Sequence, residues 1–511
     1  MKNKPLDYFS SKKNYLILLP IFVLALVLRF LYFPQNVYFG FDQARDAYAV
    51  AEIINGHFKI TGPPTATPVF NHGVLYYYLF TPFYFIWGGD PSAVSAFLRI
   101  VNAIGVFLVF VVAYPMFGAR IATLAAFLFA ISYEQTQFSL FLNHPSLAVI
   151  SVLFFYLGLS TWIFRKKIWG LLLAAFGLGL SIQFEFVEIQ LIPVFVSFLI
   201  VFRKYLPKPS FKNISFALLF FLLPVSTYIA SEVKNDFITL KQIPRLLFQN
   251  PQTVGGLSTL LTIVNRHFQD NLAANSVIAL TLGVIFLVVV SKLITKDKFR
   301  SQMTFLVLWF FGGLLIYFMT DNDGYFYNTG TSISLLIFTA FIFSKLYSKS
   351  KILVFSFLIF ILVSNVSLIV KNNPMGPNQK INPQIGLLLK DEKRIVDFIY
   401  QKAEGEKFAV NALTMPYNVN TTWSYLFEWY GAKRYGYIPI WGGDAAAGYP
   451  GNLKVEIARS RLTDKRFLII EPLEGIPTYL VDQFIVNEAK YTNIIDKKRI
   501  GTMEVWVQQP K

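Results

Sequence analysis

Apolar runs of about 20 residues recur along the first part of this chain, up to residue 370, and constrain its fold more than any other feature. A run of this length crosses the roughly 30 Å hydrocarbon core of a bilayer as one α-helix, in which every backbone polar group is satisfied. The composition agrees, because 55% of the 511 residues are hydrophobic and only 15% are charged, which excludes a disordered or coiled-coil chain. We read eleven spans, at residues 14–33, 91–117, 119–136, 145–164, 168–183, 188–203, 213–231, 275–292, 302–320, 331–346 and 352–370.

The distribution of positive charge predicts which side of the membrane each loop faces, since cytoplasmic loops are enriched in Lys and Arg. With the N-terminus in the cytoplasm, the cytoplasmic segments hold 19 basic residues and two acidic ones, whereas the longer outer loops before residue 371 hold six basic ones. The net charge of +17 therefore indicates orientation in the membrane rather than a nucleic-acid partner. We expect a multi-pass cell-membrane protein whose first span is a retained anchor, because Arg29 and Pro34 follow it in place of a small-residue cleavage site.

The last part of the chain has a different composition, which predicts a separate outer domain. Residues 385–511 are more polar, and they hold 17 basic and 15 acidic residues. Helical periodicity at 388–403 and strand-like runs at 407–413 and 467–470 predict a small α/β fold. A linker over residues 371–384, rich in Pro and Asn, would join this domain to a transmembrane domain over residues 1–370.

In this topology, the residues that could take part in chemistry lie mostly on the outer side. Two long loops, at 34–90 and 232–274, lie there, together with all four histidines and most of the acids that flank spans. Ionisable groups near membrane depth are costly and usually functional, so the outer face is the predicted chemical face. The chain contains no Cys, which excludes disulfides, thiol catalysis and Cys-ligated zinc.

The strongest local signal lies in the first outer loop, where Gly40 permits a turn and residues 42–55 predict a helix along the membrane surface. Asp42, Arg45 and Asp46 are spaced i, i+3 and i+4, so they share one face of this helix. A carboxylate there can accept a proton while the arginine holds an anion. The alternative is that Asp42 caps the helix and Arg45 is a surface ion-pair partner.

The same loop later carries Asn71 and His72, which precede a predicted aromatic helix at 73–87 that contains Tyr76. Helix N-termini attract anions, so His72 is a candidate contact for a phosphate. The alternative is a band of interfacial aromatic residues with an incidental histidine.

Three further outer positions are candidates for a site. Asn143 and His144 begin a span, although a polar residue before Pro is also ordinary helix initiation. Glu185 lies between two short spans and is either a site residue or a solvated acid. Arg266 ends a loop before a span, where it could contact a lipid phosphate or simply anchor to headgroups. The acidic run at residues 321–324 lacks the spacing of a calcium loop and is interpreted as an outer turn.

Together with the topology, these residues resemble the GT-C superfamily of integral-membrane glycosyltransferases over roughly residues 14–370. The similar branches are the bacterial protein O-mannosyltransferase-like and aminoarabinose-transferase-like enzymes. Asp42-Gln43-Ala44-Arg45 resembles the family's first-loop motif, Asp-Glu-x-Arg, with Gln43 in place of the Glu. Residues 71–78 resemble a later loop that reads acid-Lys-Pro-Pro-Leu-x-Tyr-Trp in the second branch, although both prolines are missing here.

The resemblance implies an all-α polytopic fold in which two interfacial helices of the first loop roof a cavity between the spans. It implies Asp42 as the general base, and Arg45, His72 and Arg266 as contacts to the donor phosphate. The substrate cavity would then be lined by Asp46, Asn71, Tyr76, Asn143, His144 and Glu185. Because Asn71 replaces an acid associated with metal binding in that branch, we predict no metal ligand, and a divalent metal stays open as a cofactor.

The implied reaction is inverting transfer of a sugar from a polyprenyl-phosphate donor to a hydroxyl of a protein, lipid or glycan on the outer face. A transporter or flippase of a lipid-linked sugar is the main alternative. An outer binding domain on a membrane anchor and a polysaccharide polymerase or ligase are two others. Transporters usually show internal repeats and polar breaks at the midplane, and neither is evident in this sequence, which favours the enzyme.

Overall fold

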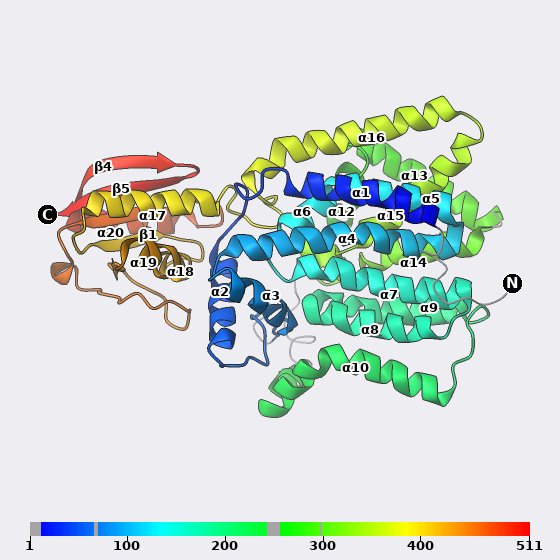
Figure 1. Ribbon diagram of the computed structural model, residues 1–511, viewed down its shortest axis with the longest axis horizontal. Coiled ribbons are helices and arrows are strands. Elements are labelled where there is room, and N and C mark those ends of the chain that lie inside the picture. Colours follow the sequence, from blue (N-terminus) through cyan, green and yellow to red (C-terminus); the bar gives the residue numbers. More distant parts are fainter. Residues whose placement is uncertain (1–11, 66–69, 243–255, 297–298) are drawn as a thin grey trace.

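The computed structural model describes residues 12–65, 70–242, 256–296 and 299–511. Figure 1 shows a bundle of helices that run side by side along the long axis, with a smaller part that contains a β-sheet at one end. This mostly helical architecture with a small C-terminal sheet confirms the predicted fold class at that level. Six charged residues that enter the predicted charge asymmetry lie outside the described residues: Lys2, Lys4, Asp7, Arg245, Asp297 and Lys298.

A helix of the bundle lies at each predicted span. They are α1 (Lys12–Phe30), α4 (Pro91–Phe117), α5 (Ala119–Ile131), α7 (Pro145–Arg165), α8 (Trp169–Phe184), α9 (Leu191–Phe202), α10 (Phe211–Lys234), α13 (Ser276–Lys296), α14 (Arg300–Gly312), α15 (Thr331–Tyr347) and α16 (Lys351–Asn372). Among the described residues, five helices are long and apolar enough to cross a membrane, namely α4, α7, α10, α13 and α16. Most of the remaining bundle helices are apolar but shorter.

Two predicted spans are interrupted in the structure. The span predicted at 119–136 ends as α5 at Ile131, because the Ser132 hydroxyl accepts a hydrogen bond from the Gln135 amide at 3.2 Å and starts a separate helix, α6 (Tyr133–Leu140). The span predicted at 302–320 ends as α14 at Gly312. The backbone of Gly313 approaches Thr331 of α15 so closely that a side chain at position 313 would collide with it.

The outward faces of α10, α13 and α16 are apolar, as expected for contact with lipid. Leu218, Leu287 and Ile359, one from each helix, are 56%, 53% and 60% exposed. In water such a surface would be unfavourable, whereas hydrocarbon chains solvate it without cost.

Two arginines of the bundle do not extend to the membrane surface. Arg29 and Arg99, near the ends of α1 and α4, would be expected to extend towards the headgroups. Both are instead fully buried. Arg29 donates to Asn102 Oδ1 at 2.7 Å and to backbone carbonyls of α1 and α5, and Arg99 donates to Asn36 Oδ1 at 3.0 Å. Because every charged donor finds an acceptor inside the protein, the side chains join helices rather than reach the surface.

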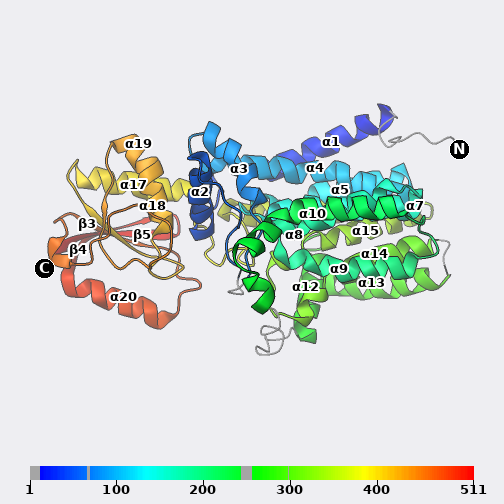
Figure 2. The same ribbon diagram turned by 90° about the horizontal axis from the view of Figure 1, so that it is seen from below.

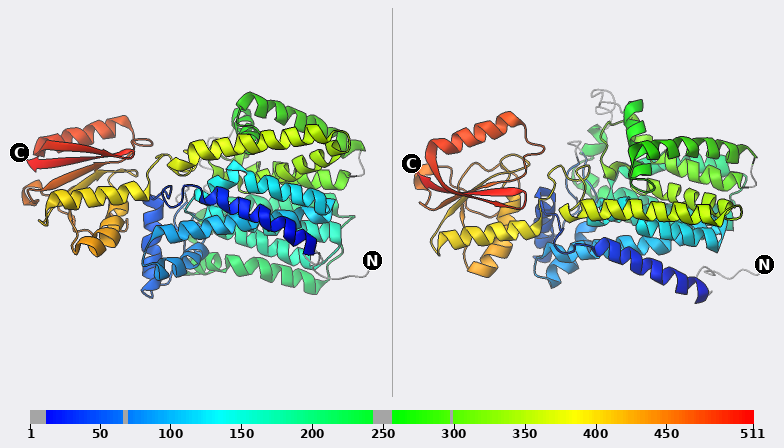
Figure 3. Two further views of the ribbon diagram at one scale, coloured as in Figure 1. Left: turned by 45° about the horizontal axis from the view of Figure 1, so that its top comes forward. Right: turned by 90° about the horizontal axis from the view of Figure 1, so that it is seen from above.

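The first loop forms two helices at one end of the bundle, as predicted. They are α2 (Phe41–Ile54) and α3 (Leu75–Ile86). Figure 1 shows α2 lying crosswise over the ends of the long helices, and both views of Figure 3 place it between the bundle and the sheet. We call this the α2 end of the bundle. The second long loop contributes α12 (Leu257–Gln269).

The C-terminal part contains a five-stranded mixed sheet with the order β2-β1-β3-β5-β4. Its elements are α17 (Leu389–Ala403), β1 (Ala409–Leu413), α18 (Thr421–Leu426), α19 (Ala432–Tyr435), β2 (Ile440–Trp441), β3 (Arg466–Ile470), α20 (Thr478–Tyr491), β4 (Thr492–Ile500) and β5 (Met503–Pro510). The predicted helix at 388–403 and the predicted strands at 407–413 and 467–470 correspond to α17, β1 and β3. Figure 2 shows α17 and α20 on opposite faces of the sheet.

The C-terminal part packs directly on the two first-loop helices. The Tyr425 hydroxyl of α18 donates to the Gly89 carbonyl after α3 at 2.6 Å, and the Tyr48 hydroxyl of α2 donates to Glu428 Oε1 at 2.9 Å. The backbone before α2 also bonds to the start of α17, because the Leu389 amide donates to the Val37 carbonyl at 2.9 Å. The sheet-containing part therefore contributes to holding α2 in place.

Candidate functional site

The start of α2 holds an arginine between two carboxylates. Arg45 Nη1 lies 2.7 Å from Asp42 Oδ1, and Arg45 Nε and Nη2 donate to Asp46 Oδ1 at 2.9 and 2.8 Å. The side chain of Asp42 is 46% exposed, whereas that of Asp46 is 2% exposed. Asp42 is therefore open to a substrate, while Asp46 is an internal counter-ion for Arg45.

Gln43 fixes where this helix begins. Its Oε1 accepts a hydrogen bond from the Gly40 amide at 3.0 Å, which caps the first turn, and its Nε2 donates to the Leu142 carbonyl at 3.2 Å. The residue that replaces the Glu of the family motif thus ties α2 to the segment before α7. Sequence reasoning missed this role, because Leu142 is 99 positions away.

Asp46 is buried against α3. The Tyr77 hydroxyl donates to Asp46 Oδ1 at 3.2 Å. Burial raises the pKa of Asp46 to about 6, and the nearby Arg45 charge only partly offsets this effect. Tyr77 was not predicted as a site residue, although it neighbours Tyr76 in the aromatic run.

Three side chains from separate segments converge next to this group. His72 Nδ1 lies 3.5 Å from Glu185 Oε1, and His144 Nδ1 lies 3.4 Å from Glu185 Oε2. The two imidazole rings are 4.0 Å apart, centroid to centroid. We call these residues the His-His-Glu cluster.

Burial controls the charge of this cluster. It lowers the pKa of His72 to about 3 and that of His144 well below its ordinary value, and the Arg45 charge adds to both effects. Burial also raises the pKa of Glu185 to about 8. The cluster is therefore a pair of neutral imidazoles around a buried acid rather than a set of ion pairs.

Local backbone structure brings the three residues together. The His72 amide donates to the Pro63 carbonyl at 2.8 Å and the Gly62 amide to the His72 carbonyl at 3.1 Å, so residues 62–65 and 70–73 lie side by side. Gly73 then lies against Gln183 near the end of α8 with no room for a side chain. His144 immediately precedes α7, and Glu185 follows α8 directly. Three helix ends thus meet at one point.

Tyr76 links the cluster to the carboxylates of α2. Its ring lies 5.1 Å from that of His144 and 4.3 Å from that of Tyr77, which bonds to Asp46. The structure therefore gathers seven of the ten predicted site residues into one site at the α2 end: Asp42, Arg45, Asp46, His72, Tyr76, His144 and Glu185.

The other three predicted residues have different surroundings. Asn143 Oδ1 accepts a hydrogen bond from the His144 amide at 2.7 Å, so it orients its neighbour. Asn71 forms an isolated β-bridge with Pro64. Arg266 belongs to a second polar group, in which it donates to Asn328 Oδ1 at 3.2 Å and lies 4.4 Å over the Tyr325 ring.

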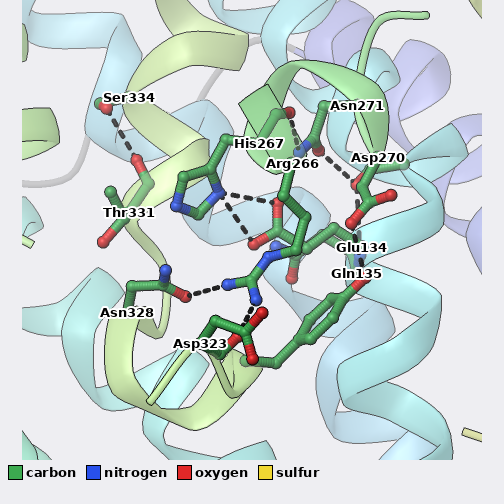
Figure 4. Close-up of polar contacts among 12 residues, drawn as sticks. Glu134, Gln135, Arg266, His267, Asp270, Asn271, Asp323, Asn328, Thr331 and Ser334 are labelled. Carbon is green, nitrogen blue, oxygen red and sulfur yellow. Dashed lines mark hydrogen bonds and ion pairs between the residues drawn. The ribbon is translucent and has the colours of Figure 1, made fainter. Parts of the chain in front are cut away.

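Figure 4 shows this second polar group, formed where α12 meets α6 and the segment before α15. His267 Nδ1 lies 3.3 Å from Glu134 Oε1, and both side chains are buried. Arg266 also donates to the Asp323 carbonyl, within the run that the sequence predicted as an outer turn. The Glu134–His267 pairing joins positions 133 residues apart, so no local sequence pattern predicts it.

Comparisons with known proteins agree with the architecture of the chain. A family model described as dolichyl-phosphate-mannose-protein mannosyltransferase matches residues 71–229. The crystal structure of ArnT from Cupriavidus metallidurans bound to undecaprenyl phosphate is similar with a TM-score of 0.61 and 11% identity, over 97% of this chain and 98% of that chain. No curated protein sequence matches the chain.

A second solved structure shares the fold. The archaeal oligosaccharyltransferase AglB from Archaeoglobus fulgidus, in complex with an inhibitory peptide and a dolichol-phosphate, is similar with a TM-score of 0.51 and 14% identity, over 97% of this chain and 74% of that chain. The chain thus shares the overall fold of these two proteins. Together with the family-model match, this confirms the resemblance to the GT-C superfamily.

Proposed function

We propose that the protein is an inverting glycosyltransferase that moves a sugar from a polyprenyl-phosphate donor to an acceptor hydroxyl at the outer face of the membrane. The observation that carries the proposal is the half-exposed Asp42 carboxylate, held 2.7 Å from Arg45 at the α2 end of the bundle. This places a proton acceptor and a fixed cation side by side at the predicted membrane boundary. The ArnT structure with undecaprenyl phosphate and the AglB structure with a dolichol-phosphate support a donor of that class.

In the proposed reaction, Asp42 takes the proton from the acceptor hydroxyl. The oxygen forms a bond to the anomeric carbon from the side opposite the phosphate, and the bond from that carbon to the phosphate oxygen breaks. Polyprenyl phosphate leaves with the electron pair, and configuration inverts. We assign stabilisation of its growing negative charge to Arg45, since the low pKa of His72 makes that residue a neutral contact. Arg266 stays a prediction for the donor phosphate, although its present partners are Asn328 and Tyr325.

The topology that this function needs is part of the proposal. Eleven crossings with a cytoplasmic N-terminus put the α2 end of the bundle on the outer side. Residues 1–370 would form the catalytic transmembrane domain, and residues 385–511 an outer α/β domain after the segment 371–384. The lipid-linked donor would then reach the site laterally from the outer leaflet.

A matched pair of variants tests the general base. Asp42→Asn keeps the size of the side chain but removes its basicity, and Glu52→Gln changes another exposed acid of α2, paired with Lys59. Purified protein in lipid is incubated with a panel of polyprenyl-phosphate sugars, and donor consumption is measured. We expect Asp42→Asn to lose about 10²–10⁴-fold of the rate and Glu52→Gln to retain it.

Two outcomes would count against the proposal. Undiminished transfer by a folded Asp42→Asn protein would exclude Asp42 as the base. Movement of an intact lipid-linked sugar across vesicles, with no donor consumed, would indicate a flippase instead.

A further inference from the structure

We propose that the His-His-Glu cluster binds one zinc ion, through Nδ1 of His72, Nδ1 of His144 and a carboxylate oxygen of Glu185. One ring nitrogen of each histidine and one Glu185 oxygen all lie within 4.8 Å of one another. Two histidines and one glutamate are a donor set of zinc sites that keep a fourth position open. The ligands differ from those suggested by the family loop, in which the acid is here Asn71. This zinc site is inferred independently of the proposed function.

The distances fit a metal better than they fit hydrogen bonds. Each Nδ1 lies 3.4 or 3.5 Å from a Glu185 oxygen, and neither Nδ1 has a hydrogen-bond partner among the described residues. Neutral N–H to oxygen hydrogen bonds are shorter, near 2.9–3.0 Å. With metal–ligand bonds of about 2.0–2.1 Å, the edge of a zinc tetrahedron is about 3.3 Å. The two nitrogen–oxygen separations, each to a different oxygen of the one carboxylate, are therefore close to the edge of such a tetrahedron.

The tautomer of His144 is already set for binding. Its ring donates a hydrogen bond to the Phe184 carbonyl. Because Nδ1 has no hydrogen-bond partner, the donor is Nε2–H, which leaves the Nδ1 lone pair free. A backbone carbonyl that orients a metal-binding histidine through its other nitrogen is a common outer contact of zinc sites.

A cation would also stabilise the ionised form of the buried Glu185 side chain. Its side chain is 2% exposed, and a buried carboxylate is strongly unfavourable without a counter-ion. Among the described residues, the ion-pair-distance partners of Glu185 are the two histidines, and neither a lysine nor an arginine lies within that distance. A divalent ion held by its oxygen supplies the missing positive charge.

The fourth position of the zinc ion faces the donor side of the site. Among the three ligands, His72 is the most exposed, at 14%. The His144 ring contacts Tyr76, which packs on Tyr77 beside the Arg45–Asp46 pair, so an anion between them would meet both cations. We assign this position to an oxygen of the donor phosphate, a step that rests on the proposed function.

Metal content tests the site without any activity measurement. The full-length protein is stripped with chelator, exchanged against excess zinc, desalted and analysed for metals. We expect about one zinc per chain, reduced about tenfold or more in His144→Ala and in the isosteric Glu185→Gln. His57→Ala, which changes an exposed histidine, controls for adventitious binding and should leave the content unchanged. Cobalt in place of zinc should give the visible absorption of a tetrahedral ion.

The experiments test the zinc site and the assignment of its fourth position separately. Equal zinc content in the native chain and both cluster variants, or binding of iron in place of zinc, would overturn the zinc site. The assignment of the fourth position is tested by adding a polyprenyl phosphate to the cobalt protein, and an unchanged spectrum would overturn it. Zinc binding by a protein that transfers no sugar would leave the site standing while the proposed function fails.

Discussion

At the scale of single residues, two acids four positions apart on α2 have opposite environments. Asp42 is 46% exposed, while Asp46 is 2% exposed and bonds to Arg45 and Tyr77. The shared helix face was predictable from the i, i+3, i+4 spacing. The burial of Asp46 was not, because it depends on how α3 packs on α2. The same limit applies to the His-His-Glu cluster, whose members are separated in the sequence and meet only through tertiary packing.

The pKa of Asp46 predicts a measurable pH dependence of stability. The carboxyl has a pKa of about 6 in the folded protein, against 3.8 ordinarily. Between these values the folded state holds a proton that the unfolded state releases, so this group makes stability rise as pH falls from about 6 to 4. Asp46→Asn lacks the titration. The melting temperature of Asp46→Asn minus that of the native chain should therefore rise between pH 4 and 6. This difference should stay constant above about pH 7.

The size of the pH effect and its control make this prediction specific. Two pKa units correspond to about 3 kcal/mol at most. Glu52→Gln removes an exposed acid of the same helix and should show a constant offset across the range. If Asp46→Asn behaves in the same way, Asp46 is ionised throughout and the proposed burial effect is wrong.

At the scale of elements, apolar periodicity located the helices well but not their interruptions. The predicted spans at 91–117 and 145–164 correspond closely to α4 and α7. The breaks after Ile131 and Gly312 depend on a side-chain cap and on close contact with a neighbouring helix, and hydropathy reports neither. The buried arginines were missed for a similar reason. Their acceptors, Asn36 and Asn102, belong to segments distant in the sequence.

The contact between Arg29 and Asn102 predicts how α1 is attached to α4. Asn102→Ala removes the 2.7 Å acceptor of a buried guanidinium. A hydrogen bond to a charged group contributes about 1.5–3 kcal/mol, and an unsatisfied buried donor adds to the loss. We expect a clear fall in melting temperature for the protein in detergent or lipid. Ile104→Ala changes a 41% exposed side chain of the same helix and is the matched control. It should lower the melting temperature much less. Equal losses in the two variants would show that Arg29 finds another acceptor.

At the scale of the whole molecule, the sheet-containing part and the candidate site lie at the same end of the bundle. Figure 3 shows α2 between them, and its Tyr48 bonds to Glu428 of the C-terminal part. Composition alone predicted a polar C-terminal fold, and it did not predict this packing on α2. The arrangement means that a change in the C-terminal part can reach the site through α2. The C-terminal part and the candidate site must therefore lie on the same side of the membrane.

The absence of cysteine from the sequence allows a direct test of this sidedness. Single cysteines are introduced at two exposed positions, Ser348→Cys between α15 and α16 and Glu474→Cys between β3 and α20. In intact cells, a membrane-impermeant maleimide should label Glu474→Cys and not Ser348→Cys, and permeabilisation should make both reactive. The charge asymmetry requires this result, because the segment near Ser348 is basic and would stay in the cytoplasm. The reverse pattern would place Asp42 and the His-His-Glu cluster in the cytoplasm, where a donor in the outer leaflet could not reach them. Labelling of both positions in intact cells would instead exclude a crossing by α16, the predicted span that lies between them.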